Sequence, residues 1–193
     1  MNSLEEHSQS VEGRESTEAR LHDLETRIAT LEQGQSQRPA GLTIIAFSND
    51  MDKLLAAFTL ATGAAAMGMP VFMFFTFWAL TAIKRRDVFK GKRGVEWLMT
   101  AMLPAGPHRL GVSKWNMFGL GRLFFEMRMR QSRVANLDRL ITLARDLEIP
   151  LVACEAAMSV MGITESELVD GVRRGGVATC LDKAMSGSVT LFI

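Results

Sequence analysis

The chain has 193 residues, of which 22 are basic and 21 acidic, so its net charge at neutral pH is +1. This length suits one domain with a sizeable core and an appendage, and the balanced charge gives no sign of a protein built to bind nucleic acid. Two cysteines are too few for a disulfide-stapled secreted fold, and the polar, acidic first residues are unlike a secretory leader, so we expect a reducing, cytoplasmic setting.

The N-terminal region differs in pattern from the remainder. Residues 1–18 are polar and acidic without an apolar period, which predicts a disordered acidic tail. Residues 19–33 predict an amphipathic helix with a heptad seam of Leu21, Leu24, Ile28 and Leu31. This helix would pair weakly as a coiled coil in an oligomer, pack on the domain or stay solvated, and residues 34–41 have the composition of a linker.

A βαβ unit opens the main domain, which spans residues 42–193. Residues 42–47 are an apolar run typical of a buried strand, and residues 48–50 follow as a turn and helix N-cap. An alanine-rich helix over 53–67 and a second strand over 71–78 complete the unit. Such a unit predicts a three-layer α/β sandwich around a mostly parallel sheet of about five strands.

No charged residue lies between Lys53 and Lys84, a run long enough to indicate a membrane-spanning segment. The Gly68-Met69-Pro70 break divides it into a helix-length piece and a strand-length piece. A parallel strand and its helix also lack charge when both faces of the sheet are covered. We therefore favour a domain that does not span the membrane, with membrane association as the alternative.

Residues 84–133 are strongly basic, which is typical of a solvated face or attracts an anionic ligand or an acidic partner protein. Nucleic acid is not expected as a partner, because base-stacking aromatic residues are not interleaved in a recognisable motif. Glycines and prolines concentrate in residues 91–121 and predict a loop excursion across the strand ends. In such a position Lys114 and Asn116 would border a site.

The C-terminal part of the domain alternates between helix and strand. Residues 136–147 predict an amphipathic helix, and Thr164 and Glu167 form a capping box that is expected to open a helix ending before Gly175. Short apolar runs predict strands over residues 151–153, 177–180 and 188–193. The last of these is expected at the sheet edge or in an oligomer interface.

Cys154 follows a predicted buried strand, and helix formers follow Cys154 until Gly162, a predicted C-cap. At such a junction the unpaired N–H groups and the positive end of the helix dipole stabilise a thiolate. The thiolate is the nucleophilic form of cysteine. Cys154 is therefore either a reactive nucleophile or a small buried hydrophobic residue.

Cys180 ends a predicted strand, so both cysteines are expected at the carboxyl edge of the sheet, where Asn49 would border the same site. If the two strands are neighbours, the sulfurs lie within disulfide reach, and Cys180 either resolves an oxidised or persulfidated Cys154 or fills the core. A metal site is not expected, because CxxC spacing is missing and His108 is the one histidine of the domain. A Cys–His pair would need His108, and without a P-loop or dinucleotide fingerprint no cofactor is expected.

Three separated segments resemble the DsrE/DsrF-like family. They are SKWNMFGLG at 113–121, the predicted helix at 136–147 and LVACEAAMSVMGITESELVDGVRRGGVAT at 151–179. The likeness covers residues 42–193 and is closest to the branch with a hydrophobic FFTFWAL strand, here Phe74 to Leu80. It implies a small flavodoxin-like α/β protein that forms a homo-oligomer and, with Cys154 as its active cysteine, takes up sulfur as a persulfide.

Three functional hypotheses follow. The first is a cytoplasmic sulfur carrier or sulfurtransferase, in which Cys154 holds a persulfide and passes sulfur between a donor and an acceptor protein. The second is a non-catalytic oligomeric scaffold, which would tolerate loss of Cys154 and is compatible with membrane association. The third is a thiol-redox, peroxiredoxin-like protein in which Cys180 resolves an oxidised Cys154.

Overall fold

The chain divides into two units, Met1–Pro39 and Ala40–Ile193, which are described separately. The computed structural model describes residues 20–30, 41–89, 91–103, 105–106, 110–112, 120–132 and 135–193. In the first unit, residues 20–30 form the predicted helix, and the side chains of Leu21, Leu24 and Ile28 are about half exposed. Leu31, the expected acidic tail and residues 34–40 of the expected linker lie outside the described residues.

In the second unit, the described residues contain five strands: β1 (Leu42–Ala46), β2 (Val71–Phe75), β3 (Leu151–Cys154), β4 (Arg173–Gly175) and β5 (Val189–Phe192). They form one sheet in the order β4-β3-β2-β1-β5, and each neighbouring pair is parallel. The carboxyl ends of the five strands therefore lie along one edge of the sheet. β5 is an outer strand, as predicted.

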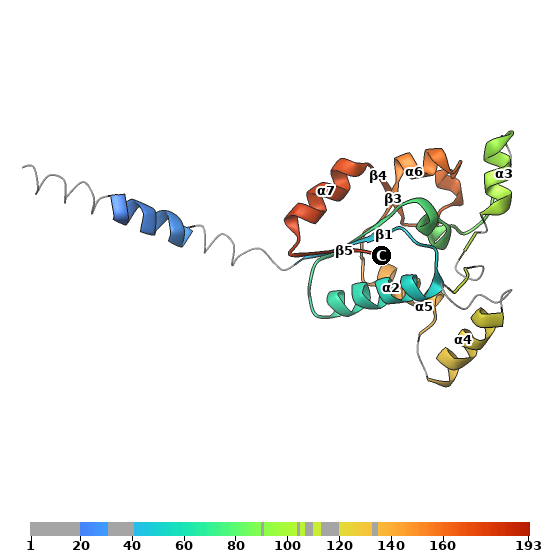
Figure 1. Ribbon diagram of the computed structural model, residues 1–193, viewed down its shortest axis with the longest axis horizontal. Helices are drawn as coiled ribbons and strands as arrows, with labels where there is room; N and C mark the ends of the chain where they lie inside the picture. Colours follow the sequence, from blue (N-terminus) through green and yellow to red (C-terminus); the bar gives the residue numbers. More distant parts are fainter. Residues whose placement is uncertain are drawn as a thin grey trace, which may run out of the picture. The chain divides into compact units, whose positions relative to one another are not determined.

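Helices cover both faces of this sheet (Figure 1). The described helices of this unit are α2 (Met51–Ala66), α3 (Val95–Met102), α4 (Leu120–Gln131), α5 (Leu137–Asp146), α6 (Glu155–Val160) and α7 (Val177–Ser186), with the 3₁₀ turns η1 (Phe77–Ile83) and η4 (Glu165–Glu167). α2 packs on α5, β1 and β2, whereas α6 contacts β3, and α7 contacts β1 and β4, on the opposite face. Since both faces are covered, every residue of β2 and β3 is buried. The predicted three-layer α/β sandwich is confirmed.

The charge-free run of the sequence folds into α2, β2 and η1 and fills the core. Phe58 of α2 and Phe75 of β2 are fully buried, with ring centroids 5.8 Å apart. No helix within the described residues combines the length and the apolar character needed to cross a membrane. The strand predicted over 71–78 ends at Phe75, because Phe77 has a backbone φ of 45° and starts η1.

Predictions for three short or irregular segments were wrong. Helix α3 lies within the loop excursion expected over residues 91–121. The capping box of Thr164 and Glu167 is present, but it opens only the three-residue turn η4, and β4 follows where a helix was expected. Residues 177–180 begin α7, with Gly176 as its N-cap, because a four-residue apolar run fits a helical turn as well as a strand.

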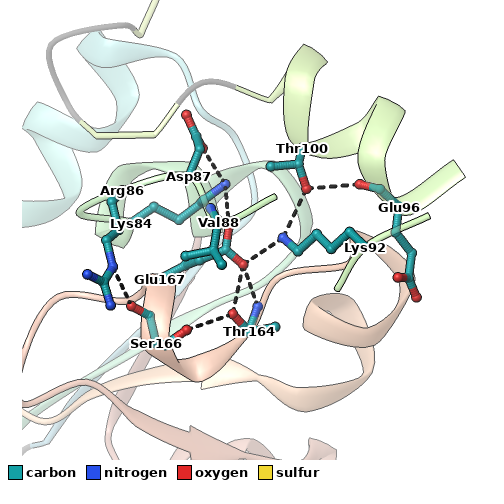
Figure 2. A network of polar contacts seen from close by, with 10 residues as sticks. All are labelled: Lys84, Arg86, Asp87, Val88, Lys92, Glu96, Thr100, Thr164, Ser166 and Glu167. Carbon is teal, nitrogen blue, oxygen red and sulfur yellow. Dashed lines mark hydrogen bonds and ion pairs between the residues drawn. The ribbon is translucent and has the colours of Figure 1, made fainter. Parts of the chain in front are cut away.

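The buried carboxylate of Glu167 joins the segment after η1 to the turn η4 (Figure 2). Its oxygens lie 2.7 Å from Lys92 Nζ and 3.5 Å from Lys84 Nζ, and they accept hydrogen bonds from the backbone N–H groups of Val88 and Thr164. The side chains of Lys84 and Lys92 are 1% and 5% exposed, so the expectation of a solvated basic face is wrong for these two. Because η1 in turn contacts α6, the network helps to hold α6 in place.

β4 and α7 come close together at Gly175, the last residue of β4. A Cβ atom at this position would lie 2.7 Å from Cγ1 of Val152 and 3.6 Å from Cβ of Thr179 in α7. The shorter of these distances is well inside van der Waals contact, so any larger residue at this position has to displace Val152.

Glu167→Gln is expected to lower the free energy of unfolding by about 3 kcal/mol at neutral pH, because it removes the carboxylate paired with the buried Lys92 and leaves Asp87 as the one carboxylate paired with the buried Lys84. Burial by itself would raise the pKa of the Glu167 carboxyl, but hydrogen bonds from Lys92, Thr164 and Val88 and the charge of Lys84 outweigh it, so the pKa lies below the usual 4.5. A lowered pKa means that the charged form stabilises the fold above pH 4.5 and that this contribution is lost as the pH falls further.

Urea unfolding of the wild type and of Glu167→Gln over a pH series measures this contribution. The difference between their free energies of unfolding should become smaller below pH 4.5. The matched control is Glu165→Gln, which removes the exposed 3.2 Å pair with Arg174 and should cost less than about 1 kcal/mol. Equal losses for the two variants, or a deficit that does not change with pH, would contradict the role given to Glu167.

Gly175→Ala is expected to lower the free energy of unfolding by about 1–3 kcal/mol, because the stiff, buried side chain of Val152 has to move. Gly63→Ala is the matched control, since a Cβ at this position in α2 meets no heavy atom within 4 Å. The same substitution there should stabilise the protein by about 0.5–1 kcal/mol. Denaturant midpoints that shift in opposite directions support the packing constraint, and a neutral Gly175→Ala refutes it.

Candidate functional site

Cys154 is the last residue of β3 and the N-cap of α6, with extended backbone angles (φ −67°, ψ 117°). The predicted handover from strand to helix is therefore confirmed, and Gly162, with a φ of 62°, lies just beyond the end of α6. The first N–H groups of a helix have no partner within the helix and favour negative charge beside them. Cys154 is a free thiol, and only 5% of the residue is exposed.

The strand register identifies the neighbours of Cys154 at the carboxyl edge of the sheet. Cys154 pairs with Gly175 of β4, and Ala153 pairs with Phe75 of β2, so Thr76 is the next residue beside Cys154. Asn49 follows β1 at the same edge, but β2 lies between β1 and β3. Two interstrand spacings amount to about 10 Å. Asn49 as a site border stays a prediction.

Phe77, just after β2, has a positive φ although it is not glycine. The left-handed backbone costs about 1–3 kcal/mol, and such residues concentrate at functional sites. The Phe77 side chain is 41% exposed, and its ring centroid lies 5.7 Å from that of Phe47, which follows β1. No signal in the sequence indicated this backbone strain, so Phe77 and Thr76 were missed as residues near the site.

Cys180 lies in the first half of α7, and it is the one buried residue among the ten of that helix. Burial raises the pKa of the Cys180 thiol, and the charge of Cys154 raises the pKa further. Cys180 does not end a strand as the sequence predicted, but the Cβ direction of Gly175, which pairs with Cys154, meets Thr179 of α7, so Cys180 lies near the same end of the sheet. Burial thus disfavours the thiolate form of Cys180.

Three other residues considered from the sequence, Lys114, Asn116 and His108, lie outside the described residues. Their roles stay predictions. Within the described ranges, no group of three His, Cys, Asp or Glu side chains is placed to hold a metal ion.

A cavity of about 610 Å³ lies at the opposite edge of the sheet. Its lining includes Leu151 and Arg173, which begin β3 and β4, together with Arg145 and Glu148. Because Cys154 is at the other end of β3, this cavity is not part of the cysteine site. Within the described residues, the carboxyl edge of the sheet thus holds a buried free thiol at a helix start, Cys154, and α7 carries a second buried thiol, Cys180.

Comparison with known proteins adds to this geometry. A model of the DsrE/DsrF/DrsH-like family matches residues 39–192. The chain is 39% identical over 152 residues to the uncharacterized protein YrkE of Bacillus subtilis (strain 168), with 78% of this chain and 95% of YrkE covered. It is 27% identical over 161 residues to the sulfur carrier protein DsrE2 of Allochromatium vinosum, with 79% and 97% covered.

Among solved structures, the crystal structure of the ychN protein from E. coli aligns with 80% of this chain and 99% of that chain, with a TM-score of 0.46 and 14% identity. The family match includes all five strands and both cysteines. Together with the likeness to YrkE, it identifies the chain: this protein belongs to the DsrE/DsrF/DrsH-like family.

Proposed function

We propose that this protein carries sulfur as a persulfide on Cys154 and passes it to the thiol of a partner protein. The observation that carries the proposal is the place of Cys154, a free thiol at the end of β3 and at the start of α6. A relative named as a sulfur carrier protein supports it, because the similarity to that protein extends over 79% of this chain.

The loading step is a nucleophilic displacement on a sulfane-sulfur donor such as thiosulfate or polysulfide. The Cys154 thiol loses its proton, and the thiolate forms a bond to the outer sulfur of the donor. With thiosulfate, the sulfur–sulfur bond of the donor breaks and sulfite leaves with the electron pair. An acceptor thiolate then attacks the outer sulfur of the persulfide and restores the Cys154 thiolate.

The burial of Cys154 favours small donors, because only 5% of the residue is exposed. Apolar surroundings also exclude water and bulky oxidants from the loaded sulfur. The transferred atom is the outer sulfur, which stands about 2 Å beyond Cys154 Sγ. An acceptor therefore needs to reach this outer atom and not the buried Sγ.

A second candidate is a scaffold that assembles through α7. Val177, Leu181 and Met185 are spaced by one helical turn, and each is more than half exposed. Such a stripe of apolar side chains fits a second copy of the same surface in a homo-oligomer. In this candidate Cys154 would be a packing residue.

Two single-thiol variants test the carrier function by intact mass after brief exposure to polysulfide. In Cys180→Ser the remaining thiol is Cys154, and the protein should gain the mass of one sulfur atom in a form that dithiothreitol removes. In Cys154→Ser the remaining thiol is Cys180, whose pKa is raised by burial, and no adduct should form.

Circular dichroism of the two variants controls for folding. The proposal fails if the Cys180→Ser protein takes up no sulfur, or if the adduct forms equally on the protein that lacks Cys154.

The scaffold candidate predicts that Leu181→Arg lowers the molar mass measured by light scattering, because a charge would be buried between two copies of α7. Ser186→Arg is the matched control, since Ser186 is exposed on α7 but outside the apolar stripe. Cys154→Ala should leave the molar mass unchanged. An unchanged mass for Leu181→Arg removes this candidate.

A further inference from the structure

The side chains of Val152 and Cys154 point to the same face of the sheet. Residues alternate between faces along a strand, and Cys154 still has extended backbone angles. The Cβ direction of Gly175 meets both Val152 and Thr179, so the start of α7 lies on this face, above the end of β4. Cys154 and the first turns of α7 therefore share one face at one edge of the sheet.

Cys180 follows Thr179 directly and is the buried residue of α7. Both cysteines belong to the hydrophobic core, where they are 5% and 6% exposed. Burial raises the pKa of the Cys180 thiol, and the charge of Cys154 raises it further. Since a Cβ at Gly175 would meet Val152 of β3 and Thr179 of α7, the glycine permits α7 to pack closely at this end of the sheet.

We propose that Cys180 is a second reactive thiol of the site, which discharges the Cys154 persulfide when no acceptor is present. This inference rests on the proposed function, because it needs sulfur loaded on Cys154. Burial raises the pKa of Cys180 and so disfavours its attack on a donor in solution, whereas attack within the site needs no encounter between two molecules. The Cys180 thiol gives up its proton, and its sulfur attacks Cys154 Sγ. A bond forms between the two cysteine sulfurs, the bond between Cys154 Sγ and the outer sulfur breaks, and hydrosulfide leaves with the electron pair and takes the proton.

The step balances without an external oxidant. The outer sulfur is reduced to sulfide, while the Cys180 sulfur is oxidised to the level of a disulfide. Two molecules of a low-molecular-weight thiol, or one dithiol, then return the disulfide to two free thiols. The outer sulfur of the Cys154 persulfide can thus leave in two ways. It is transferred to an acceptor thiol, or it is released as sulfide.

The test loads wild type and Cys180→Ser with polysulfide, removes the donor, and follows released sulfide and intact mass over time. Wild type should release one sulfide per loaded chain and end two hydrogen atoms lighter than the reduced protein. Cys180→Ser should keep its adduct about ten-fold longer or more, because it lacks the intramolecular attacking group. Cys180→Ala should behave like Cys180→Ser, and Ala178→Ser, which keeps both thiols, should behave like wild type.

The two proposals fail in different ways. A wild-type adduct that lasts as long as that of Cys180→Ser overturns the discharge step and leaves the carrier function in place. No adduct on Cys180→Ser overturns the carrier function itself. A separate measurement needs no persulfide: diamide, a thiol oxidant, should link Cys154 to Cys180 within one chain, and the absence of this link in peptide mass maps overturns the second-thiol assignment.

Discussion

The close packing of α7 beside the end of β3 depends on Gly175, which has no side chain. Every residue of β3 is buried, and the strand ends in Cys154 at the start of α6. The helices on the two faces of the sheet therefore pack closely against this strand. α7 packs against the sheet next to Gly175, where an added methyl group would collide with Val152. Thr179, which precedes the buried Cys180, lies 3.6 Å from the Cβ position of Gly175, so the packing of this part of α7 depends on the glycine.

The polar contacts of Glu167 with Lys84, Lys92, Val88 and Thr164 fix the segment after η1 against the turn η4. An ion pair inside a protein gains little net stability over apolar packing, because both charges lose their hydration. Its effect is to fix which groups meet, since each buried charge accepts only a few partners. No described buried side-chain nitrogen or oxygen lacks a hydrogen bond, so the network closes completely around Glu167. It ties the basic segment to η4 and, through η1, to α6.

Some elements could be predicted well from the sequence because their local apolar pattern and capping residues agree with their packing in the fold. The apolar runs of β1 and β3 are short and bounded, and α5 has a clear apolar stripe and a cap in which Asn136 Oδ1 accepts the Arg139 N–H. The junction at Cys154 followed from the same logic, because a buried run is followed at once by helix formers.

What could not be predicted depends on contacts between distant parts of the chain. The buried Lys92 pairs with Glu167, which is far away in the sequence, so a local charge count makes Lys92 look solvated. The four residues 177–180 carry no period that distinguishes a strand from a helical turn. The backbone angle of Phe77 is imposed by the connection from β2 to η1, and aromatic residues do not prefer it.

α7 is attached to the sheet mainly by one buried side chain, that of Cys180, and by the hydrogen bond from Thr43 Oγ1 to the carbonyl of Lys183. An element with so little buried apolar surface can detach locally at a small fraction of the global unfolding free energy, and such openings govern amide hydrogen exchange. Each detachment would uncover the face on which Cys154 lies. A covalent bond between the two sulfurs would tie α7 to the end of β3 and suppress this local detachment until a reductant cleaves the bond.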